Sequence, residues 1–500
     1  MMKKICAILL ATLLSLSLFA CSAAPNKDGI MGEAGMNGDM LPGAPVSPGM
    51  DYEYEEVKES GFIDPLENAN STFSLDRNTA NYAMARRMIN GGSKVPTGSV
   101  RIEEYVNYFN YNYQRPEKGE GLALGGSLTD CAWNSEHKTF TVSVSAEEIS
   151  FEEKKQNNIV FLIDTSGSML GDDRLGLIKQ AFTMLTENLE DNDIVSIVTY
   201  ASGVRVAAEG LLGKDKLTIA NVLQDLNAGG STNGAGGIQL AYETAEKYYV
   251  EGGNNRVILA TDGDFNVGIR NKNDLYEFIS EKRNLGIWLS VLGVGMYNTS
   301  DTTMKTLAEN GNGNYGYLDS VSEAKKLLVK EMGGTLVTVA KDVKINVNFN
   351  ADAVEKYRLI GYETKMMSME DFENYEKDAG EIGSGHTVTA VYEIKLKDGA
   401  SGTFASAEIR YKHPETNEQN SITKDYTTDL AEEEVSEDVI FIGCVTEFGL
   451  ILRNSEYKAN ASFTSVIERL QTLECVCGVD ADEFKAEFLE LCQKARSIYG

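Results

Sequence analysis

The sequence predicts an α/β fold, in which a mostly parallel central sheet covered by helices is inserted into a β-sandwich, with helical segments before and after. Three observations support this prediction. Between residues 155 and 335, continuous apolar runs alternate with amphipathic stretches, a pattern typical of a sheet that helices cover on both faces. Before residue 150 and again after residue 340, apolar residues alternate with period two, as in sandwich strands. Beyond residue 434 the apolar spacing favours helices.

The apolar pattern divides the central region into strands and helices. Short uninterrupted apolar runs indicate strands, while apolar residues at intervals of three and four positions indicate helices with one buried face. The clearest such spacing is that of Leu175, Ile178, Phe182, Leu185 and Leu189. We expect strands at 158–164, 194–200, 256–261, 287–294 and 315–318, and helices at 174–189, 214–226, 236–250, 272–284, 301–309 and 321–333.

The sandwich strands lie on both sides of this central region. Their alternating apolar positions predict half-buried strands, with one face toward a core and the other toward solvent. These positions are Phe140, Val142 and Val144 before the central region, and Val343, Ile345, Val347, Phe349, Val388, Ala390, Tyr392, Ile394 and Leu396 after it. Because the strands flank the central region in sequence, we expect that region to be an insertion.

The segments that flank the sandwich are predicted to be helical. A helix expected at 79–90 is followed by an aromatic cluster made of Tyr105, Tyr108, Phe109, Tyr111 and Tyr113. Such a cluster can bind sugar or peptide, but it more often docks one element onto a core. The predicted organisation is a signal peptide at 1–20, a tether at 21–60, an N-terminal region at 61–150, the inserted domain at 155–335, the rest of the sandwich at 340–432 and a helical region at 434–500.

The N-terminus has the pattern of an export signal. Two lysines precede an apolar stretch that ends at Cys21 and is shorter than the ~18 residues of a membrane-spanning helix. The stretch Leu18-Phe-Ala-Cys21 is similar to a lipobox, which implies that Cys21 carries a lipid anchor; simple secretion is the alternative. Residues 21–60 have the Gly-, Pro- and acid-rich composition of a flexible tether. Scattered methionines could suggest a copper site, but in a flexible tether they are more often incidental. They are Met31, Met36, Met40 and Met50.

Length and charge limit the classes of partner. The chain has 500 residues, 42% of them hydrophobic, and a formal net charge of −29. This length accommodates about two to four domains. The charge argues against nucleic acid or an anionic lipid surface as a partner, because phosphate recognition needs clustered Lys and Arg. We therefore expect contact with the membrane only through the lipid anchor.

The cysteines are expected to be mostly reduced and buried. Of seven, Cys6 and Cys21 belong to the N-terminal segment, which leaves Cys131, Cys444, Cys475, Cys477 and Cys492. An odd number cannot all pair within one chain, and free cysteines are commonly buried as small apolar groups. A bridge from Cys492 to Cys475 or Cys477 is the alternative, since exported proteins can form disulfides.

Oxygen-bearing side chains follow two apolar strands and a glycine-rich loop of the central region. Asp164, Ser166 and Ser168 end the first strand. Thr232 lies in the loop, and Asp262 ends a later strand. Open α/β sheets bind ligands at the carboxyl ends of their strands, and Mg²⁺ takes about six oxygen ligands while keeping several waters. The sequence therefore predicts a site for Mg²⁺, or for Mn²⁺ or Ca²⁺.

Each piece of this pattern has a simpler explanation on its own. The Asp and Ser side chains of an Asp-x-Ser-x-Ser motif often only hydrogen-bond to the nearby backbone in turns and helix caps. The glycines around Thr232 could cradle a phosphate, but no Gly-Lys-Ser/Thr follows them, and no Gly-x-Gly-x-x-Gly opens a helix after a strand. Found together in this order, the three motifs favour the metal. In that arrangement the three hydroxyls touch the ion, both carboxylates act mostly through water, and one position stays open for a partner's carboxylate.

The five residues resemble the metal-ion-dependent adhesion site of von Willebrand factor type A (VWA) domains. More widely, about residues 61–500 are similar to the bacterial YfbK-type VWA lipoproteins, with Ser384 where members of that family have alanine. The resemblance implies a VWA fold, and in related VWA domains ligation is coupled to movement of the last helix, here 321–333. The similar segments are 71–76, 101–109, 229–237, 260–268, 357–362 and 378–386.

The pattern favours a binding protein over an enzyme. A hydrolase needs a nucleophile with a positioned base, and none of His137, His386 and His413 lies in a recognisable catalytic motif. His386 precedes a predicted strand, where we expect a structural hydrogen bond. The leading hypothesis is a surface-tethered, divalent-cation-dependent module that binds an acidic side chain of a partner protein. A structural scaffold or assembly factor of an envelope complex is the alternative, and a metal-dependent hydrolase is less favoured.

Overall fold

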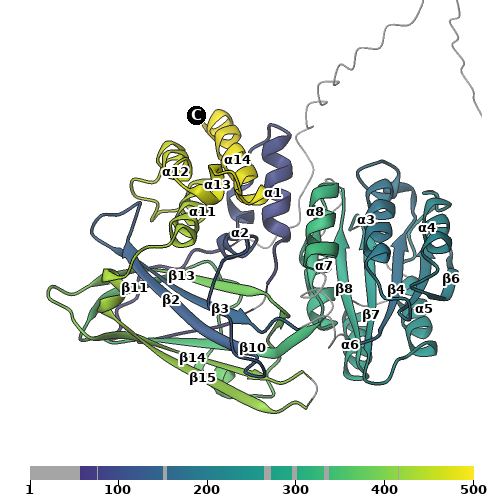
Figure 1. Cartoon of the computed structure of the whole chain (residues 1–500), viewed down its shortest axis with the longest axis horizontal. Helices are drawn as coiled ribbons and strands as arrows, with labels where there is room; N and C mark the ends of the chain where they lie inside the picture. The colour runs from purple at the N-terminus through teal and green to yellow at the C-terminus, as the bar shows by residue number, and fades with distance from the viewer. Residues whose placement is uncertain are drawn as a thin grey trace, which may run out of the picture. The chain divides into compact units, whose positions relative to one another are not determined.

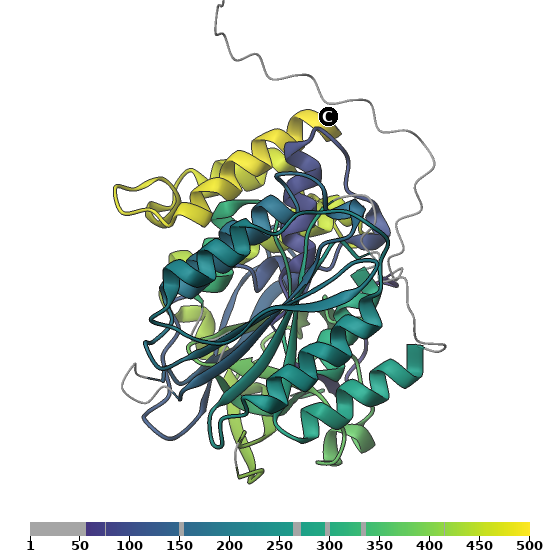
Figure 2. The same cartoon turned by 90° about the vertical axis from the view of Figure 1, so that its right-hand side faces the viewer.

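The computed structural model describes residues 57–75, 77–149, 155–263, 272–295, 301–331, 337–414 and 416–500 (Figures 1 and 2). The predicted signal peptide, Cys21 and most of the predicted tether at 21–60 lie outside these ranges. Within them, no helix has the length and apolar character needed to cross a membrane. The described residues belong to one compact unit, Pro48–Gly500.

The inserted region forms a six-stranded sheet in the order β6-β5-β4-β7-β8-β9 (Figure 1). All neighbouring strands are parallel except β6, which is antiparallel to β5 at one edge. The strands are β4 (Asn157–Asp164), β5 (Ile194–Tyr200), β6 (Val204–Leu212), β7 (Asn254–Thr261), β8 (Ile287–Gly293) and β9 (Tyr315–Tyr317). The predicted mostly parallel sheet is therefore confirmed, and β6 is the strand that the apolar pattern did not reveal.

Helices cover both faces of this sheet (Figure 2). The odd-numbered apolar residues of β4 pack with α3 (Leu175–Glu187), α4 (Lys216–Gln224) and α8 (Val321–Lys325). Its even-numbered apolar residues pack with α5 (Gly234–Lys247), α6 (Lys272–Asn284) and α7 (Asp301–Asn310). Burial on both faces explains the uninterrupted apolar run of β4. The last helix was predicted at 321–333, but only Val321–Lys325 is α-helical. A π-helical turn at Lys326–Lys330 follows it.

The β-sandwich takes strands from both sides of the insertion. One sheet has the order β1-β10-β14-β15, with β12 also paired to β10, and the other has the order β11-β13-β3-β2. The first contains β1 (Asn70–Ser74), β10 (Thr338–Phe349), β12 (Gly380–Gly383), β14 (Thr403–Lys412) and β15 (Gln419–Thr427); the second contains β2 (Leu122–Asp130), β3 (Lys138–Ala146), β11 (Val354–Ile360) and β13 (Thr387–Leu396). Because β1 pairs with β10 and β3 with β13, the predicted insertion is confirmed.

Strands β3 and β13 differ from the half-buried strands that alternation predicted, because both of their faces are buried. Their apolar face forms the sandwich core, while their polar face lies against the segment after α2. Asn107 Oδ1 accepts a hydrogen bond from the Thr389 backbone N–H at 2.7 Å, and the Tyr113 and Thr389 hydroxyls are 2.7 Å apart. Hydrogen bonding satisfies these polar groups, which allows them to be buried.

The helical region combines segments from both ends of the described chain. Four residues of the aromatic cluster are buried there against rings such as Phe441, Phe448 and Phe488, and Tyr113 is partly buried against the same core, which confirms docking. The five cysteines of the described chain are free, with Cys477 exposed and Cys475 half-buried. The remaining helices are α1 (Ala80–Asn90), α2 (Ile102–Val106), α10 (Met369–Glu373), α11 (Glu437–Arg453), α12 (Phe463–Leu470), α13 (Glu474–Cys477) and α14 (Glu483–Tyr499), with short 3₁₀ turns at Thr97–Ser99, Gly167–Met169 and Thr428–Glu432.

A buried guanidinium ties α1 to the inserted region. Arg86 donates hydrogen bonds to both carboxylate oxygens of Asp319 at 2.6 and 2.7 Å, and to Glu323 of α8 at 2.7 Å. The Tyr108 hydroxyl also donates to Glu323 at 2.6 Å. These charged groups are almost completely buried, so each depends on the others for its hydrogen bonds.

Candidate metal centre

The candidate centre lies where β4 and β7 end side by side. In the parallel register Ile163 of β4 pairs with Ala260 of β7, so that Asp164 and Thr261 follow at the same level. Asp262 is the next residue beyond β7. Asp164 is completely buried and Asp262 is 2% exposed. The register thus brings both predicted carboxylates to the carboxyl edge of the sheet, where the fold class places ligands.

Asp164 is held by neutral hydrogen-bond donors. Its Oδ1 accepts from the Ser166 backbone N–H at 2.8 Å, and its Oδ2 accepts from the Thr261 hydroxyl at 3.0 Å. Burial, with a further contribution from the charge of Asp262, raises the pKa of Asp164 to about 6, although the hydrogen bonds oppose this shift. Two buried acids that repel each other in this way are stabilised by a cation.

The two serines of the first motif lie together. A 3₁₀ turn at Gly167–Met169 folds the chain after Ser166, and the Ser166 and Ser168 Oγ atoms are 3.0 Å apart. Ser166 is buried, whereas Ser168 is partly accessible. The side chain of Arg174 donates to the Ser168 backbone carbonyl at 2.5 Å, which holds the turn without using the hydroxyl.

The loop that carries Thr232 is attached to the first motif through its glycines. The Gly167 N–H donates to the Gly230 carbonyl at 3.0 Å, and the Gly229 N–H donates to the Thr165 carbonyl at 2.8 Å. Gly230 has a φ of +90°, which favours glycine. Thr232 itself is half-buried and directly precedes the residue that caps α5. The structure therefore brings the loop to the motif, while these hydrogen bonds leave the Thr232 hydroxyl uninvolved.

Three residues that sequence reasoning missed complete the surroundings, namely Thr261, Arg174 and Tyr200. Tyr200 ends β5 beside Asp164 and is fully buried, so that burial, with smaller contributions from Asp164 and Asp262, raises its hydroxyl pKa well above the usual value. An ideal Cβ on Gly237 of α5 would lie 2.7 Å from the Tyr200 ring. A signal was available, because Tyr200 is the last residue of a strand predicted to end at the same edge.

The donor set fits a hard divalent cation. Asp164 and Asp262 lie at the ends of neighbouring strands, the Ser166 and Ser168 hydroxyls are adjacent, and a third hydroxyl lies in the attached loop. Oxygen donors of this kind suit Mg²⁺, which prefers oxygen ligands with few carboxylates and retains waters. The burial of Asp164 and Asp262 at the ends of neighbouring strands is the observation that favours a cation most directly.

The sequence matches three protein families. Residues 158–330 match the von Willebrand factor type A domain, and residues 49–141 match a family described as von Willebrand factor. Residues 334–404 and 395–498 match the family described as "Uncharacterized protein YfbK, C-terminal". The chain is 36% identical over 471 residues to the "Uncharacterized protein YfbK" of Escherichia coli K12, covering 89% of this chain and 81% of that protein.

Solved structures resemble parts of the chain. A von Willebrand factor type A protein from Catenulispora acidiphila has 16% identity and a TM-score of 0.41, covering 73% of this chain and 88% of its own. The proximal thread matrix protein 1 of the mussel byssus, described "with zinc occupied MIDAS motif", has 22% identity and a TM-score of 0.30, covering 36% of this chain and 48% of its own. On the family matches and the identity to the Escherichia coli protein, the chain belongs to the YfbK family of VWA-domain proteins.

Proposed function

We propose that this protein is a divalent-cation-dependent protein-binding module of the cell envelope, and that it is not an enzyme. The observation that carries the proposal is the pair of buried carboxylates at the ends of neighbouring strands, with two adjacent serine hydroxyls following one of them. Membership of a VWA-domain family is consistent with protein binding. The partner that this site suits is a protein with an accessible Asp or Glu.

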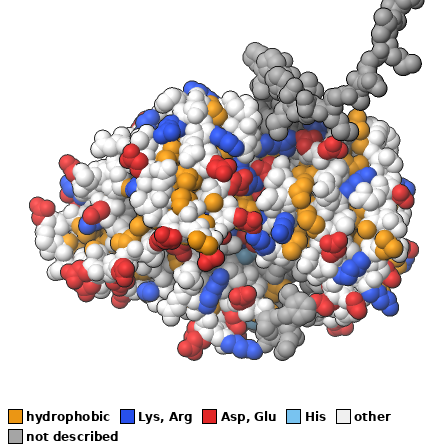
Figure 3. Space-filling view, turned by 45° about the horizontal axis from the view of Figure 1, so that its top comes forward, with side chains coloured by type: hydrophobic (Ala, Val, Ile, Leu, Met, Phe, Trp, Pro, Cys, Tyr) orange, Lys and Arg blue, Asp and Glu red, His pale blue; other side chains and the backbone are white. Residues whose placement is uncertain are grey.

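In the proposed site, Ser166, Ser168 and Thr232 hold Mg²⁺, with Mn²⁺ or Ca²⁺ as alternatives, while Asp164 and Asp262 accept hydrogen bonds from its waters. When bound, the ion supplies positive charge for a partner's carboxylate. That charge matters because the chain has a net charge of −29. Figure 3 shows acidic side chains spread over the face in view, with basic ones among them. Without a local cation, such a surface repels an acidic partner.

The surroundings of the site support a docking role. Leu170 follows the first motif by two residues and is 74% exposed. Val204, at the start of the edge strand β6, is 38% exposed and lies close to Gly236 of α5, near the Thr232 loop. Exposed apolar side chains are common singly, but here they flank a polar site, so a partner that supplies a carboxylate also covers apolar surface.

The envelope location rests on the N-terminal sequence. We propose that Cys21 carries lipid and that residues 21–60 form a tether between the membrane and the folded chain. The protein then contacts the membrane through its anchor alone. A scaffold whose metal serves only folding is the competing role, and it differs in one respect: metal removal lowers its stability without a separate loss of partner capture.

Pull-down from native envelopes tests the proposal. The mature protein serves as bait with Mg²⁺ or with chelator, as wild type, as Ser168→Ala and as Ser231→Ala. Ser231 is the matched control, because its exposed hydroxyl lies beside Thr232 but bonds to Ser202 at 3.3 Å. We expect a protein captured by wild type and Ser231→Ala only, and released by chelator. Capture that Ser168→Ala and chelator leave unchanged would contradict the proposal.

A further inference from the structure

One basic side chain beside the candidate metal centre has no acidic partner. Arg174 reaches back to the first motif, where its Nη1 donates to the Ser168 backbone carbonyl at 2.5 Å. Its Nε is buried and has no hydrogen-bond partner, and no ion pair joins its guanidinium to a carboxylate of the described residues. A guanidinium carries several N–H donors and keeps its charge in proteins. Most of the hydrogen-bonding capacity of Arg174 is therefore unused.

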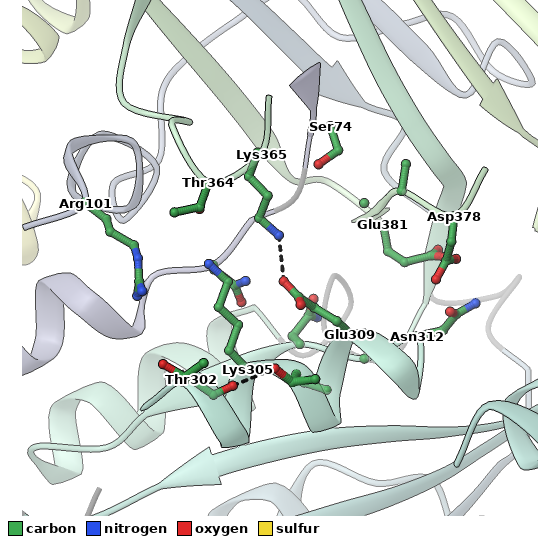
Figure 4. Close-up of a pocket in the computed structure, with 17 residues that line it drawn as sticks. Ser74, Arg101, Thr302, Lys305, Glu309, Asn312, Thr364, Lys365, Asp378 and Glu381 are labelled. Carbon is green, nitrogen blue, oxygen red and sulfur yellow. Dashed lines mark hydrogen bonds and ion pairs between the residues drawn. The ribbon is translucent and has the colours of Figure 1, made fainter. Parts of the chain in front are cut away.

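Buried and half-buried basic side chains elsewhere in the described segments commonly meet a carboxylate. In the cavity between α7 and the sandwich, Lys365 donates to Glu309 at 2.7 Å (Figure 4). Beside Arg174 in sequence, Asp173 is already paired with Arg87 at 2.5 Å. The charge of Arg174 is thus left for an anion that comes from outside the described chain.

The fold places Arg174 at the same sheet edge as the candidate metal centre. Arg174 directly precedes α3, which follows the parallel strand β4, so it lies at the carboxyl edge with Asp164. Gly295, two residues beyond β8, has a φ of +76°, and an ideal Cβ there would lie 2.8 Å from the Arg174 Nε. Glycine tolerates both this backbone conformation and this close approach. The guanidinium therefore lies between the end of β8 and the first motif.

The surroundings of Arg174 favour an anion. The first turn of α3 contains no acidic residue, and no side chain caps its amino end. The positive end of the helix dipole is therefore not neutralised there, and Arg174 adds a full charge to it. Arg174 is half-buried, and Leu170 and Asp172 in the loop before it are exposed, so a protein that docks on this loop approaches the guanidinium.

We propose that Arg174 is a second anchor for the partner's acidic side chain, because its guanidinium can donate hydrogen bonds to the same carboxylate that a cation at the first motif would attract. This inference rests on the proposed function and names a residue of this chain that selects the charged group. A planar guanidinium matches the two oxygens of a carboxylate, whereas a neutral amide of the same shape offers a single oxygen. The site therefore distinguishes Asp from Asn, and Glu from Gln.

Ligand-observed NMR on the mature protein tests this inference, with acetyl-Gly-Asp-Gly-amide as the probe and acetyl-Gly-Asn-Gly-amide as its neutral control. In Mg²⁺, we expect wild type to bind the Asp peptide at least about tenfold more tightly than the Asn peptide, since the amide loses the charge-assisted hydrogen bonds. Equal binding of the two peptides, or binding of neither, would overturn the assignment.

The variant Arg174→Lys separates ligand binding from support of the turn. Lysine keeps the charge and can still donate to the Ser168 carbonyl, but it lacks the planar fork. We expect the Asp peptide to bind about tenfold more weakly, while the affinity for Mg²⁺ stays within about twofold of wild type. Arg115→Lys is the matched control, because the Arg115 Nη1 also donates to backbone carbonyls, those of Ala146 and Gly385.

Two results with Arg174→Lys would count against the inference. Unchanged binding of the Asp peptide would exclude a contact between the guanidinium and the ligand. A loss of Mg²⁺ affinity as large as the loss of peptide affinity would show that Arg174 only supports the turn at Ser168. Thermal unfolding verifies that the variant is folded.

A metal-free series distinguishes this inference from the proposed function. Failure of wild type to bind Mg²⁺ would contradict the proposed function alone. The guanidinium contact needs no ion, so it is also measured without metal in Asp164→Asn, which removes an acid that repels the peptide. In that background, Arg174→Lys should still weaken binding of the Asp peptide by about tenfold. Equal binding with and without Arg174→Lys would overturn the inference.

Discussion

At the residue scale, the surroundings of Asp164 support our proposal that this carboxylate serves binding rather than stability. It is completely buried, its hydrogen-bond donors are neutral, and a second acid lies close enough to help raise its pKa to about 6. Ionisation of such a group at neutral pH costs free energy in the metal-free protein. Local rules of protein stability are often broken in this way at functional sites.

Asp164→Asn should therefore stabilise the metal-free protein. The amide keeps the shape and removes the charge facing Asp262, so the free energy of unfolding at pH 7.5 in chelator should rise by about 1–3 kcal/mol. Urea unfolding measures it, with the exposed neighbour Asp172→Asn as a control that should change little. A decrease for Asp164→Asn would show that the carboxylate contributes to stability without a metal.

Gly237→Ala should destabilise the packing of α5 against Tyr200, which lies beside Asp164. The added Cβ would lie 2.7 to 3.0 Å from atoms of the buried Tyr200 side chain, and overpacking of this kind costs about 1–3 kcal/mol. The gain in helix propensity offsets roughly 1 kcal/mol of that cost. Gly229→Ala is the control, since its Cβ would meet nothing within 4 Å. Equal melting temperatures for the two variants would rule out the predicted clash.

The site could be predicted only in part from the sequence. Asp164, Ser166, Ser168 and Asp262 end apolar runs, and the structure places them together at one sheet edge. Thr261 could not be singled out, because its hydroxyl reaches Asp164 only through the pairing of β4 with β7, which the sequence does not specify.

At the element scale, the polar faces of β3 and β13 show where period-two alternation stops being informative. Alternation distinguishes the two faces of a strand but does not reveal what covers the second face. The segment after α2 covers it here through Asn107 and Tyr113. The edge strand β6 was missed because its residues are mostly half-exposed and form no continuous apolar run.

Arg86→Met should loosen the contact between α1 and α8. It leaves Asp319 and Glu323 buried without their cation, and loss of one member of a buried ion pair costs about 3–5 kcal/mol. Hydrogen exchange should accelerate in α1, α8 and α14. Arg87→Met is the matched control, since Arg87 pairs with the half-exposed Asp173 and should cost less. Unchanged exchange in Arg86→Met would show that packing alone holds α1.

At the scale of the whole molecule, sandwich strands precede and follow the inserted region in the sequence. Strands on either side of it in sequence pair with each other, so the sandwich cannot form from one side alone. The order of apolar patterns along the chain was sufficient to predict this arrangement. The contacts between the inserted region and the sandwich were not predictable, because single charged residues such as Arg77 and Glu331 form them across 254 positions of sequence.

His386 should make this junction sensitive to acid. Burial first, and then the charge of Arg77, lower its pKa from 6.5 to about 3; Lys326 and Arg115 act in the same direction and Glu331 opposes them. His386 therefore takes up a proton below about pH 6.5 in the unfolded chain, but only near pH 3 in the folded chain. The stability that this group contributes is complete above pH 6.5 and is lost as the pH falls toward 3, by up to about 4–5 kcal/mol.

Urea unfolding between pH 7 and 4 measures this effect. His386→Phe, which cannot take up a proton, should lose less stability over the range than wild type, whereas the exposed His413→Phe should follow wild type. Parallel pH profiles for wild type and His386→Phe would contradict the account of the junction.

The most direct test of the central claim is calorimetric titration of Mg²⁺ and Mn²⁺ into the mature protein. Wild type and Ser231→Ala should bind one ion. Asp164→Ala and Ser168→Ala should bind at least about tenfold more weakly, while they unfold at temperatures close to that of wild type. Equal binding by wild type and Asp164→Ala would contradict the claim that a cation occupies this edge of the sheet.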